Sequence, residues 1–478
     1  MPHIYTYKID NLTEIMIKRS LLPLLLLISL SAMAQKNPAP FKDGDRIIFA
    51  GNSITEAGFY PNYIWLYYIT HFPERKIEVM NGGIGGDVAK QIYTRLEGDL
   101  LAKKPNVLIV TFGMNDSKYF EYGMHKDKVD SVRKAAVDSS YKSFQLIEQK
   151  LNALPNIQKI MMTSSPYDET MKNEKNYFPG KWKTMEEIIR FQKAAATKDN
   201  WAYVDLFYPM TAMEQKIQKD DSTFTLTGPD RIHPGNAGHF VMAYLFLKAQ
   251  QLANQPIADI SIDATKNKVL QSRNCTVSNL SSKNNTVSFT YLAKSLPYPI
   301  DTISRIWGNP QKQNEALQVI PFIKEFDQEI LTVKGLKGNN YSISIDGNEV
   351  TKCTAQALDT GVNLASLSNT PQYQQAKAIM DLQLKRKELE DKMRAYYWIN
   401  YDYLNSKGML FNDSQVALDS VTNAAKKDFF VASKKDAYTE TRLQSTRDKI
   451  QQQMNEMRDE MYKMAKPATH TITVTQVD

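Results

Sequence analysis

Short apolar runs alternate with longer amphipathic stretches from Asp45 to about Leu252. Runs that are nearly continuous in Ile, Val and Met are typical of strands buried on both faces. We expect five such strands, at Arg46–Ala50, Ile77–Met80, Val107–Thr111, Ile160–Thr163 and Tyr203–Asp205. The amphipathic stretches predict helices at Tyr60–His71, Val88–Ala102, Asp130–Leu151, Thr184–Lys198 and Asn236–Gln251. This alternation indicates an α/β fold with helices on both faces of a parallel sheet, and ligands of such sheets bind beyond the carboxyl ends of the strands.

The pattern changes after Pro256, where short alternating segments replace the long helices. The alternation is clearest at Val287–Tyr291, Ile330–Val333 and Tyr341–Ile345, and turn sequences such as Asp346-Gly347-Asn348 separate the segments. We therefore predict a small antiparallel β-rich domain over residues 256–366. The tail, residues 467–478, alternates again, and we expect it to add an edge strand to this domain.

Residues 367–466 are rich in Lys, Glu, Gln, Met and Ala and contain almost no Gly or Pro. This composition predicts two or three long helices, with breaks near Ser406–Asn412 and Ala432–Ala437. Aromatic side chains crowd into one part of the region, at Tyr396, Tyr397, Trp398, Tyr401 and Tyr403. We expect them to pack against another domain, because aromatic stripes in helices are usually core, and a sugar-binding surface is the alternative.

The first 34 residues have the three parts of a secretory signal peptide. Lys18–Arg19 precede the apolar run Leu21–Leu30, and Ala32–Ala34 place small residues at both cleavage-specifying positions. The apolar run is too short for a permanent membrane span. We expect Met16 to be the true start, Gln35 to begin the mature chain, and the protein to be secreted or periplasmic.

Length and composition narrow the architecture and the partners. The 478 residues exceed one compact core, and we divide the mature chain into an α/β domain at 35–255, the β-rich domain, the helical region and the tail strand. The net charge of +7 comes with no run of basic and aromatic residues, so nucleic acid is not an expected partner. The six His are scattered, and neither Cys275 nor Cys353 lies in a CxxC or CxxH, so we expect no metal or cofactor. An oxidising compartment would permit these two cysteines to pair, and two free thiols are the alternative.

Candidate chemistry lies at the two ends of the α/β domain. The first expected strand runs into Gly51-Asn52-Ser53, which places Ser53 on the rim where ligands bind, although a serine there is also a common helix cap. A polar loop before the last helix carries Asp230 and His233. A nucleophilic serine needs a base, and the base needs an anion that holds its tautomer, so these three side chains have the types that acyl transfer requires.

Two further segments lie between these ends. Four glycines in the stretch 82–86 follow the second strand, and they leave backbone N–H groups free to approach a ligand closely. Asn115 follows the third strand, and its amide can donate to an oxygen that becomes negative during acyl transfer. Asp116 and His239 are assigned to structure, because polar residues near turns and helix starts usually bond backbone groups.

In order, these four segments resemble the blocks of the SGNH/GDSL hydrolase family, over about residues 45–252. The resemblance implies a flavodoxin-like three-layer α/β/α domain without a metal. It also implies that Ser53 is the nucleophile, that Asp230 and His233 complete a catalytic triad, and that the oxyanion hole is made by the N–H groups of Ser53 and Gly86 and the side chain of Asn115. One position departs from the family, because Asn52 stands where it usually has Asp; Asn can still accept a hydrogen bond, so we expect the turn to survive.

Export, the four blocks and the large additional domains favour a carbohydrate esterase that removes an acetyl or similar small acyl group. A lipid or aryl esterase is one alternative. A non-catalytic carbohydrate- or protein-binding protein on the same scaffold is another, which the presence of Ser53, Asn115, Asp230 and His233 argues against. The expected partner is an acylated carbohydrate or another small ester.

Overall fold

The computed structural model describes residues 35–124 and 128–477, together with Met1. Apart from Met1, the predicted signal peptide lies outside the described residues. Five parallel strands form the central sheet in the order β2-β1-β3-β4-β5. Their bounds are β1 Arg46–Gly51, β2 Glu78–Gly83, β3 Val107–Val110, β4 Gln158–Met162 and β5 Ala202–Val204. The predicted α/β class is confirmed, and all five expected strands are present.

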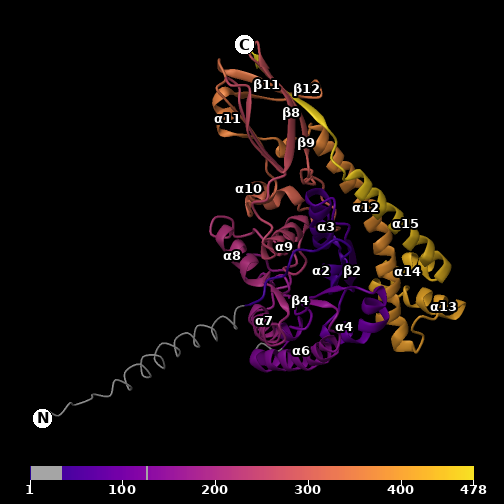
Figure 1. Cartoon of the computed structure of the whole chain (residues 1–478). Coiled ribbons are helices and arrows are strands. Elements are labelled where there is room, and N and C mark those ends of the chain that lie inside the picture. The colour runs from indigo at the N-terminus through magenta and orange to yellow at the C-terminus, as the bar shows by residue number, and fades with distance from the viewer. Residues whose placement is uncertain (2–34, 125–127, 478) are drawn as a thin grey trace.

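Helices cover both faces of this sheet because successive side chains of a strand point to opposite sides. In β1, Ile47 and Phe49 face one buried cluster, whereas Ile48 and Ala50 face the other. The first cluster is covered mainly by α3 (Phe59–His71), α8 (Phe207–Ile217) and α9 (Asn236–Ala249). The second is covered by α4 (Ala89–Arg95), α6 (Val129–Asn152) and α7 (Lys181–Lys198). The domain is therefore a three-layer sandwich (Figure 1).

The expected helix Val88–Ala102 is interrupted. α4 ends at Arg95 and is followed by a π-helical turn, Leu96–Leu100, and a 3₁₀ turn, Leu101–Lys103. Short helices also occur at α2 (Ser53–Glu56) and α5 (Glu121–Met124). The π turn carries the buried Asp99, whose ion pairs are described below.

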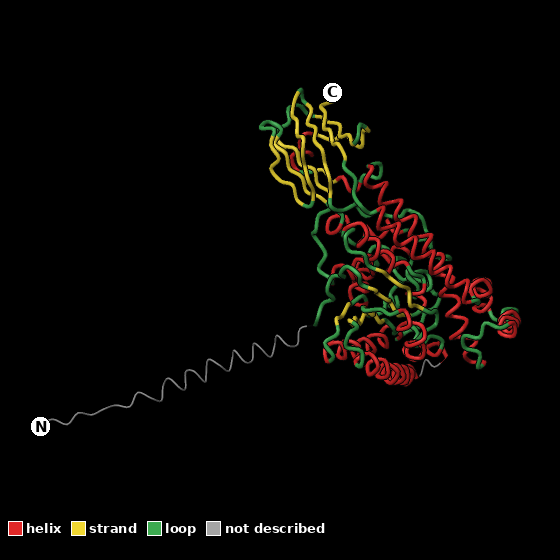
Figure 2. The backbone as a smooth tube through the Cα atoms, turned by 45° about the vertical axis from the view of Figure 1, so that its right-hand side comes forward, coloured by secondary structure: helices red, strands yellow, loops and turns green. Residues whose placement is uncertain are grey.

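Two sheets form the β-rich unit. The first, in the order β13-β10-β6-β7, consists of β6 Ala258–Asp263, β7 Lys268–Arg273, β10 Glu329–Lys334 and β13 Val362–Asn363. The second, in the order β12-β11-β14-β9-β8, consists of β8 Cys275–Lys283, β9 Thr286–Ala293, β11 Asn340–Ile345, β12 Asn348–Thr354 and β14 His470–Val477. The expectation of a purely antiparallel domain is wrong in one pair, because β6 and β10 run parallel. Short helices α10 (Phe322–Phe326) and α11 (Ala355–Thr360) complete the unit. Figure 2 shows these strands gathered at the end of the molecule that holds the C-terminus.

The tail is the central strand of the second sheet and not its edge. β14 pairs with β11 on one side and β9 on the other, and its Ile472 and Val474 are fully buried. The edge prediction is wrong. A central strand buries its apolar side chains between neighbours on both sides, whereas an edge strand leaves one side of them exposed to water. Cys275 and Cys353 lie on β8 and β12, the opposite edges of this sheet, and both are free thiols.

The helical region contains α12 (Pro371–Trp398), α13 (Gln415–Ala424), α14 (Phe429–Thr441) and α15 (Gln444–Met464). A π-helical turn, Ile399–Leu404, and a 3₁₀ turn, Asn405–Lys407, follow α12. The break expected near Ser406–Asn412 is confirmed, but the one near Ala432–Ala437 is wrong, since those residues lie inside α14. Asp428 caps α14 by accepting from the N–H groups of Phe430 and Val431, so this helix begins earlier than composition suggests.

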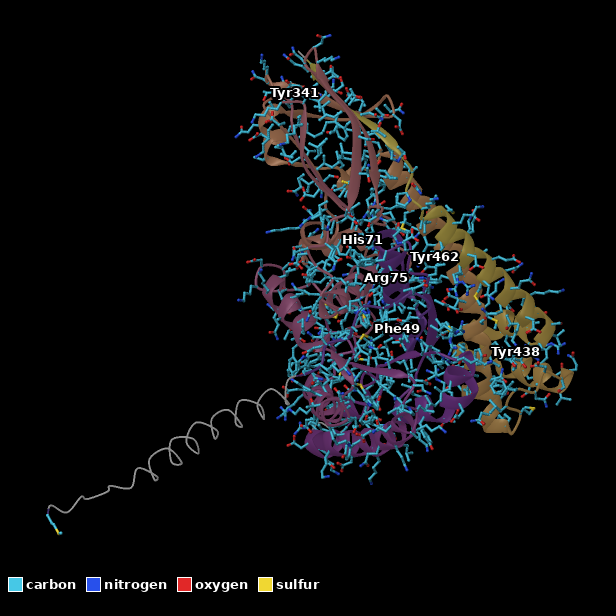
Figure 3. All side chains as sticks on the ribbon, viewed as in Figure 1. Phe49, His71, Arg75, Tyr341, Tyr438 and Tyr462 are labelled. Atoms are coloured by element: carbon cyan, nitrogen blue, oxygen red, sulfur yellow. The ribbon has the colours of Figure 1, made fainter. Side chains whose placement is uncertain are left out.

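The α12–α15 pair runs from the β-rich unit along one side of the α/β domain (Figures 1 and 2). Figure 3 labels Phe49 in the first buried cluster of the α/β domain, Tyr341 in the core of the β-rich unit and Tyr438 in the core of the helical region. The first core also takes in residues from far downstream: Leu296, Phe322, Ile379 and Met461. Over the described residues, no helix combines the length and apolar character that crossing a membrane requires.

Tyr462, which is labelled in Figure 3, connects α15 to the α/β domain through three hydrogen bonds. Its hydroxyl accepts from Trp65 Nε1 at 3.2 Å and from the Ile77 N–H at 2.9 Å, and it donates to the Ile77 carbonyl at 3.0 Å. Tyr462→Phe removes these three hydrogen bonds and leaves the buried Trp65 Nε1 without this acceptor, whereas the Ile77 N–H still donates to the Arg75 carbonyl at 3.1 Å. We expect the substitution to lower the free energy of unfolding by about 1–3 kcal/mol. Urea denaturation measures this. Tyr208→Phe, which alters an exposed tyrosine on α8, is the control. An equal loss of unfolding free energy in both variants would contradict the role of Tyr462 in holding α15 against the α/β domain.

Candidate active site

Ser53 is held on the rim of the sheet by a tight turn between β1 and α2. A side chain at Gly51 would place its Cβ 2.1 Å from Thr55 Oγ1, so only glycine fits there. Asn52 Oδ1 accepts from the Ile54 N–H at 3.0 Å and so caps α2. The expectation that Asn preserves the turn is confirmed.

Ser53, His233 and Asp230 form one chain of hydrogen bonds. Ser53 Oγ lies 2.8 Å from His233 Nε2, and His233 Nδ1 lies 2.6 Å from Asp230 Oδ2. The other carboxylate oxygen of Asp230 accepts from the N–H groups of Ile232 at 3.0 Å and of His233 at 2.9 Å. The side chain of His233 is 48% exposed, so the imidazole lies at the surface of the domain. Residues from opposite ends of the α/β domain thus meet as the sequence predicts.

The charge of Asp230 is stabilised locally. Burial acts to raise the pKa of Asp230, but the hydrogen bond and charge of His233 and the two backbone N–H groups lower it below its usual value. Asp230 therefore remains an anion at mildly acidic and neutral pH, which is the state that can hold an imidazole and stabilise its protonated form.

Arg231 anchors the loop segment between Asp230 and His233. Arg231 has a positive φ of 66°, which turns its side chain away from the triad. Its buried guanidinium donates to the backbone carbonyls of Asp168 at 2.9 Å and Lys175 at 3.1 Å, and also to that of Asn173. This anchor restricts the positions that Asp230 and His233 can take.

Asn115 lies beside the glycine-rich loop in a defined orientation. Its Nδ2 donates to the Asp87 carbonyl at 2.9 Å, and its Oδ1 accepts from the Tyr119 hydroxyl at 2.6 Å. A primary amide carries two N–H groups, so one remains for a ligand. Gly86 is exposed, with a positive φ of 91° that favours glycine. The contribution of Tyr119 was not predicted; its spacing of four residues from Asn115 is the only sequence signal.

Asp116 and His239 have structural surroundings, as expected. Asp116 accepts from the N–H groups of Gly113 and Ala89, both at 3.1 Å, and from Ser140 Oγ at 2.7 Å. His239 stacks on Tyr60, and burial lowers the pKa of its imidazole to about 3, so it stays neutral. Across residues 35–124 and 128–477, no group of three or more His, Cys, Asp or Glu side chains is placed to hold a metal ion.

Comparison with known proteins identifies the family of this chain. The model of the GDSL-like Lipase/Acylhydrolase family matches residues 49–240. A solved structure described as a gut microbial diltiazem-metabolizing enzyme is 41% identical, covers 92% of this chain and 100% of its own, and superimposes with a TM-score of 0.90. The chain belongs to the GDSL-like lipase/acylhydrolase family. As an acylhydrolase it is a carboxylic ester hydrolase acting on acyl esters.

Two further similarities concern parts of the acylhydrolase. Residues 377–466 match the model called diltiazem deacetylase C-terminal helical domain. The α/β domain is similar to an acetylxylan esterase from Geobacillus stearothermophilus, with 27% identity over 220 residues, 43% of this chain and 93% of that one.

The acylhydrolase also contains a buried chain of charges that sequence reasoning missed. Asp87 pairs with Arg95 at 2.6 Å, Arg95 with Asp99 at 2.7 Å, and Asp99 with both terminal nitrogens of Arg394 at 2.8 and 2.7 Å. Lys103 also contacts Asp99. Burial raises the pKa of Asp87 to about 6 against the opposing charge of Arg95. Burial would also raise the pKa of Asp99, but the charges of Arg394, Lys103 and Arg95 outweigh it and hold the pKa far below its usual value.

This chain of charges supports the backbone at Gly51 and Gly83, near Ser53 and Gly86. Arg95 donates to the Gly51 carbonyl at 3.0 Å, just before Ser53, and Arg394 donates to the Gly83 carbonyl at 2.9 Å. The spacing of Arg95 and Asp99 is a sequence signal for an ion pair on one helix. Nothing in the sequence links either residue to Arg394, which lies 295 positions after Asp99.

Proposed function

We propose that this acylhydrolase is a serine esterase that removes an acyl group, most simply acetyl, from a carbohydrate through an acyl-enzyme. The observation that carries the proposal is the continuous hydrogen-bond chain from Ser53 through His233 to Asp230. A serine, an imidazole and a carboxylate in this order are what proton removal from a hydroxyl nucleophile requires.

In the proposed reaction, Ser53 Oγ attacks the ester carbonyl carbon while its proton passes to His233 Nε2. The negative oxygen of the tetrahedral intermediate accepts from the N–H groups of Ser53 and Gly86 and from Asn115 Nδ2. The intermediate collapses, and the leaving alcohol takes the proton from His233. Water then attacks the acyl-enzyme by the same steps, with His233 as base, and releases the carboxylic acid and free Ser53.

Two observations favour a carbohydrate as the alcohol part. The α/β domain is similar to a protein named for acetylxylan. In addition, Trp307 is 93% exposed at the tip of a turn whose Asn309 lies within 3.5 Å of the His233 carbonyl. An exposed indole on this turn offers an apolar face on which a sugar ring can stack.

A second candidate substrate is a compact non-sugar acetyl ester such as diltiazem. It is favoured by the 41% identical solved structure and by the similarity of the helical region to a diltiazem deacetylase. Either substrate would pass through the same proposed chemistry, so the two candidates differ only in what binds beside Ser53.

Substrate preference can be measured directly. We expect 4-nitrophenyl acetate to be cleaved with higher kcat/KM than 4-nitrophenyl octanoate, and acetylated xylo-oligosaccharides to release acetate with higher kcat/KM than diltiazem. Trp307→Ala should raise KM for the oligosaccharide and leave 4-nitrophenyl acetate cleavage nearly unchanged. A preference for octanoate would favour a lipid esterase, and absence of turnover of every ester by folded protein would favour a binding protein.

The proposed roles also predict a ranking of substitutions, measured as kcat and KM on 4-nitrophenyl acetate. Ser53→Ala and His233→Ala should each abolish turnover, because nucleophile and base act as one unit. Asn115→Ala should lower kcat about 10²–10³-fold with little change in KM, the usual cost of one oxyanion donor. Asp230→Ala should fall between a slight and a severe loss. Near-native kcat in a clean preparation of Ser53→Ala would rule out the serine mechanism.

A further inference from the structure

The helical region contacts the glycine-rich loop at the peptide that carries the proposed Gly86 donor. Trp398 is the last residue of α12, and its Nε1 donates to the Gly85 carbonyl at 3.1 Å. The Gly85 carbonyl and the Gly86 N–H belong to the same planar peptide unit. Because no peptide bond among the described residues is cis, these two groups point in opposite directions. Fixing the carbonyl therefore fixes the direction of the Gly86 N–H.

A peptide between two glycines needs such a constraint. Neither Gly85 nor Gly86 has a side chain that restricts its dihedral angles, and Gly86 already lies in the left-handed region. A Cβ added at Gly86 would meet nothing within 4 Å, so no neighbouring atom packs against its α-carbon. The Asp87 N–H closes a turn by donating to the Ile84 carbonyl at 3.2 Å, and the hydrogen bond from Trp398 acts on the carbonyl of the peptide inside that turn.

The surrounding contacts keep Trp398 in place. Arg394, one helical turn earlier on α12, pairs with the buried Asp99 and donates to the Gly83 carbonyl. On the other side, the Gly85 N–H donates to Glu56, which pairs with Lys434 of α14. A Cβ built at Gly85 would lie 3.8 Å from both Ser53 Cβ and Trp398 Nε1, so Gly85 lies beside both side chains.

We propose that Trp398 is a positioning residue for the oxyanion hole: its indole N–H holds the Gly85–Gly86 peptide so that the Gly86 N–H faces the reacting oxygen. This inference rests on the proposed serine esterase function. It gives the helical region a part in catalysis, since a residue more than 300 positions from Ser53 sets the direction of an oxyanion donor.

The test is to remove the indole N–H and keep the ring. Trp398→Phe should lower kcat on 4-nitrophenyl acetate about 3- to 10-fold, the population shift that one hydrogen bond can produce, with KM changed less than about twofold. Inhibition by phenylboronic acid should weaken by the same factor, because its tetrahedral serine adduct places an oxygen in the same hole. Trp201→Phe is the matched control, since Trp201 Nε1 also makes a hydrogen bond, to Asn152 at 3.0 Å, in the second core.

A second variant separates positioning from packing. Replacing Trp398 by benzothienylalanine keeps the shape of the indole and substitutes sulfur for the N–H, and it should reproduce the loss in kcat. Folded Trp398→Phe with unchanged kcat and unchanged boronate inhibition would overturn the proposal. So would a benzothienyl variant with native kcat. Failure of the proposed function is recognised separately, because Ser53→Ala would then retain turnover.

Discussion

The ion pair between Asp99 and Arg394 is the interaction on which the arrangement of the proposed active site depends. Both side chains are at most 2% exposed, and the two terminal nitrogens of Arg394 meet the two oxygens of Asp99. Removing one partner of such a pair leaves a buried charge and typically costs about 3–5 kcal/mol. The helical region is therefore held against the α/β domain, and this contact allows Arg394 and Trp398 to reach the loop from Gly83 to Gly86.

Segments that are far apart in the chain also come together in the β-rich unit. Its second sheet is completed by β14, which follows the entire helical region in the chain and is paired on both sides. α12 and α15 lead out of and back into this unit, and residues of both helices enter the core of the α/β domain. The consecutive domains therefore do not coincide with the buried cores, because the core of the α/β domain contains residues from several parts of the chain. A chain ending near Ala253 would lack side chains that cover the face of the sheet beneath α3 and α9.

Local patterns were sufficient to predict the central sheet and the residues that meet at its rim. Each buried strand has its own apolar run, and Ser53, Asn115, Asp230 and His233 each lie in a recognisable segment, so family resemblance places them together. What was missed depends on contacts between distant segments. The central position of β14, the docking of Trp398 on Gly85 and the pairing of Arg394 with Asp99 follow from tertiary packing. The start of α14 also depends on a single capping residue, Asp428, which the composition of the whole segment does not reveal.

The most direct test of the account is to identify the serine that becomes covalently modified. A fluorophosphonate reacts with a serine that is activated by a neighbouring base, and digestion followed by mass spectrometry locates the adduct. The account predicts a single adduct on the peptide that contains Ser53, formed by the native protein and not by the His233→Ala variant. An adduct on another serine, or equal labelling of both proteins, would contradict the assignment of Ser53 and His233 as nucleophile and base.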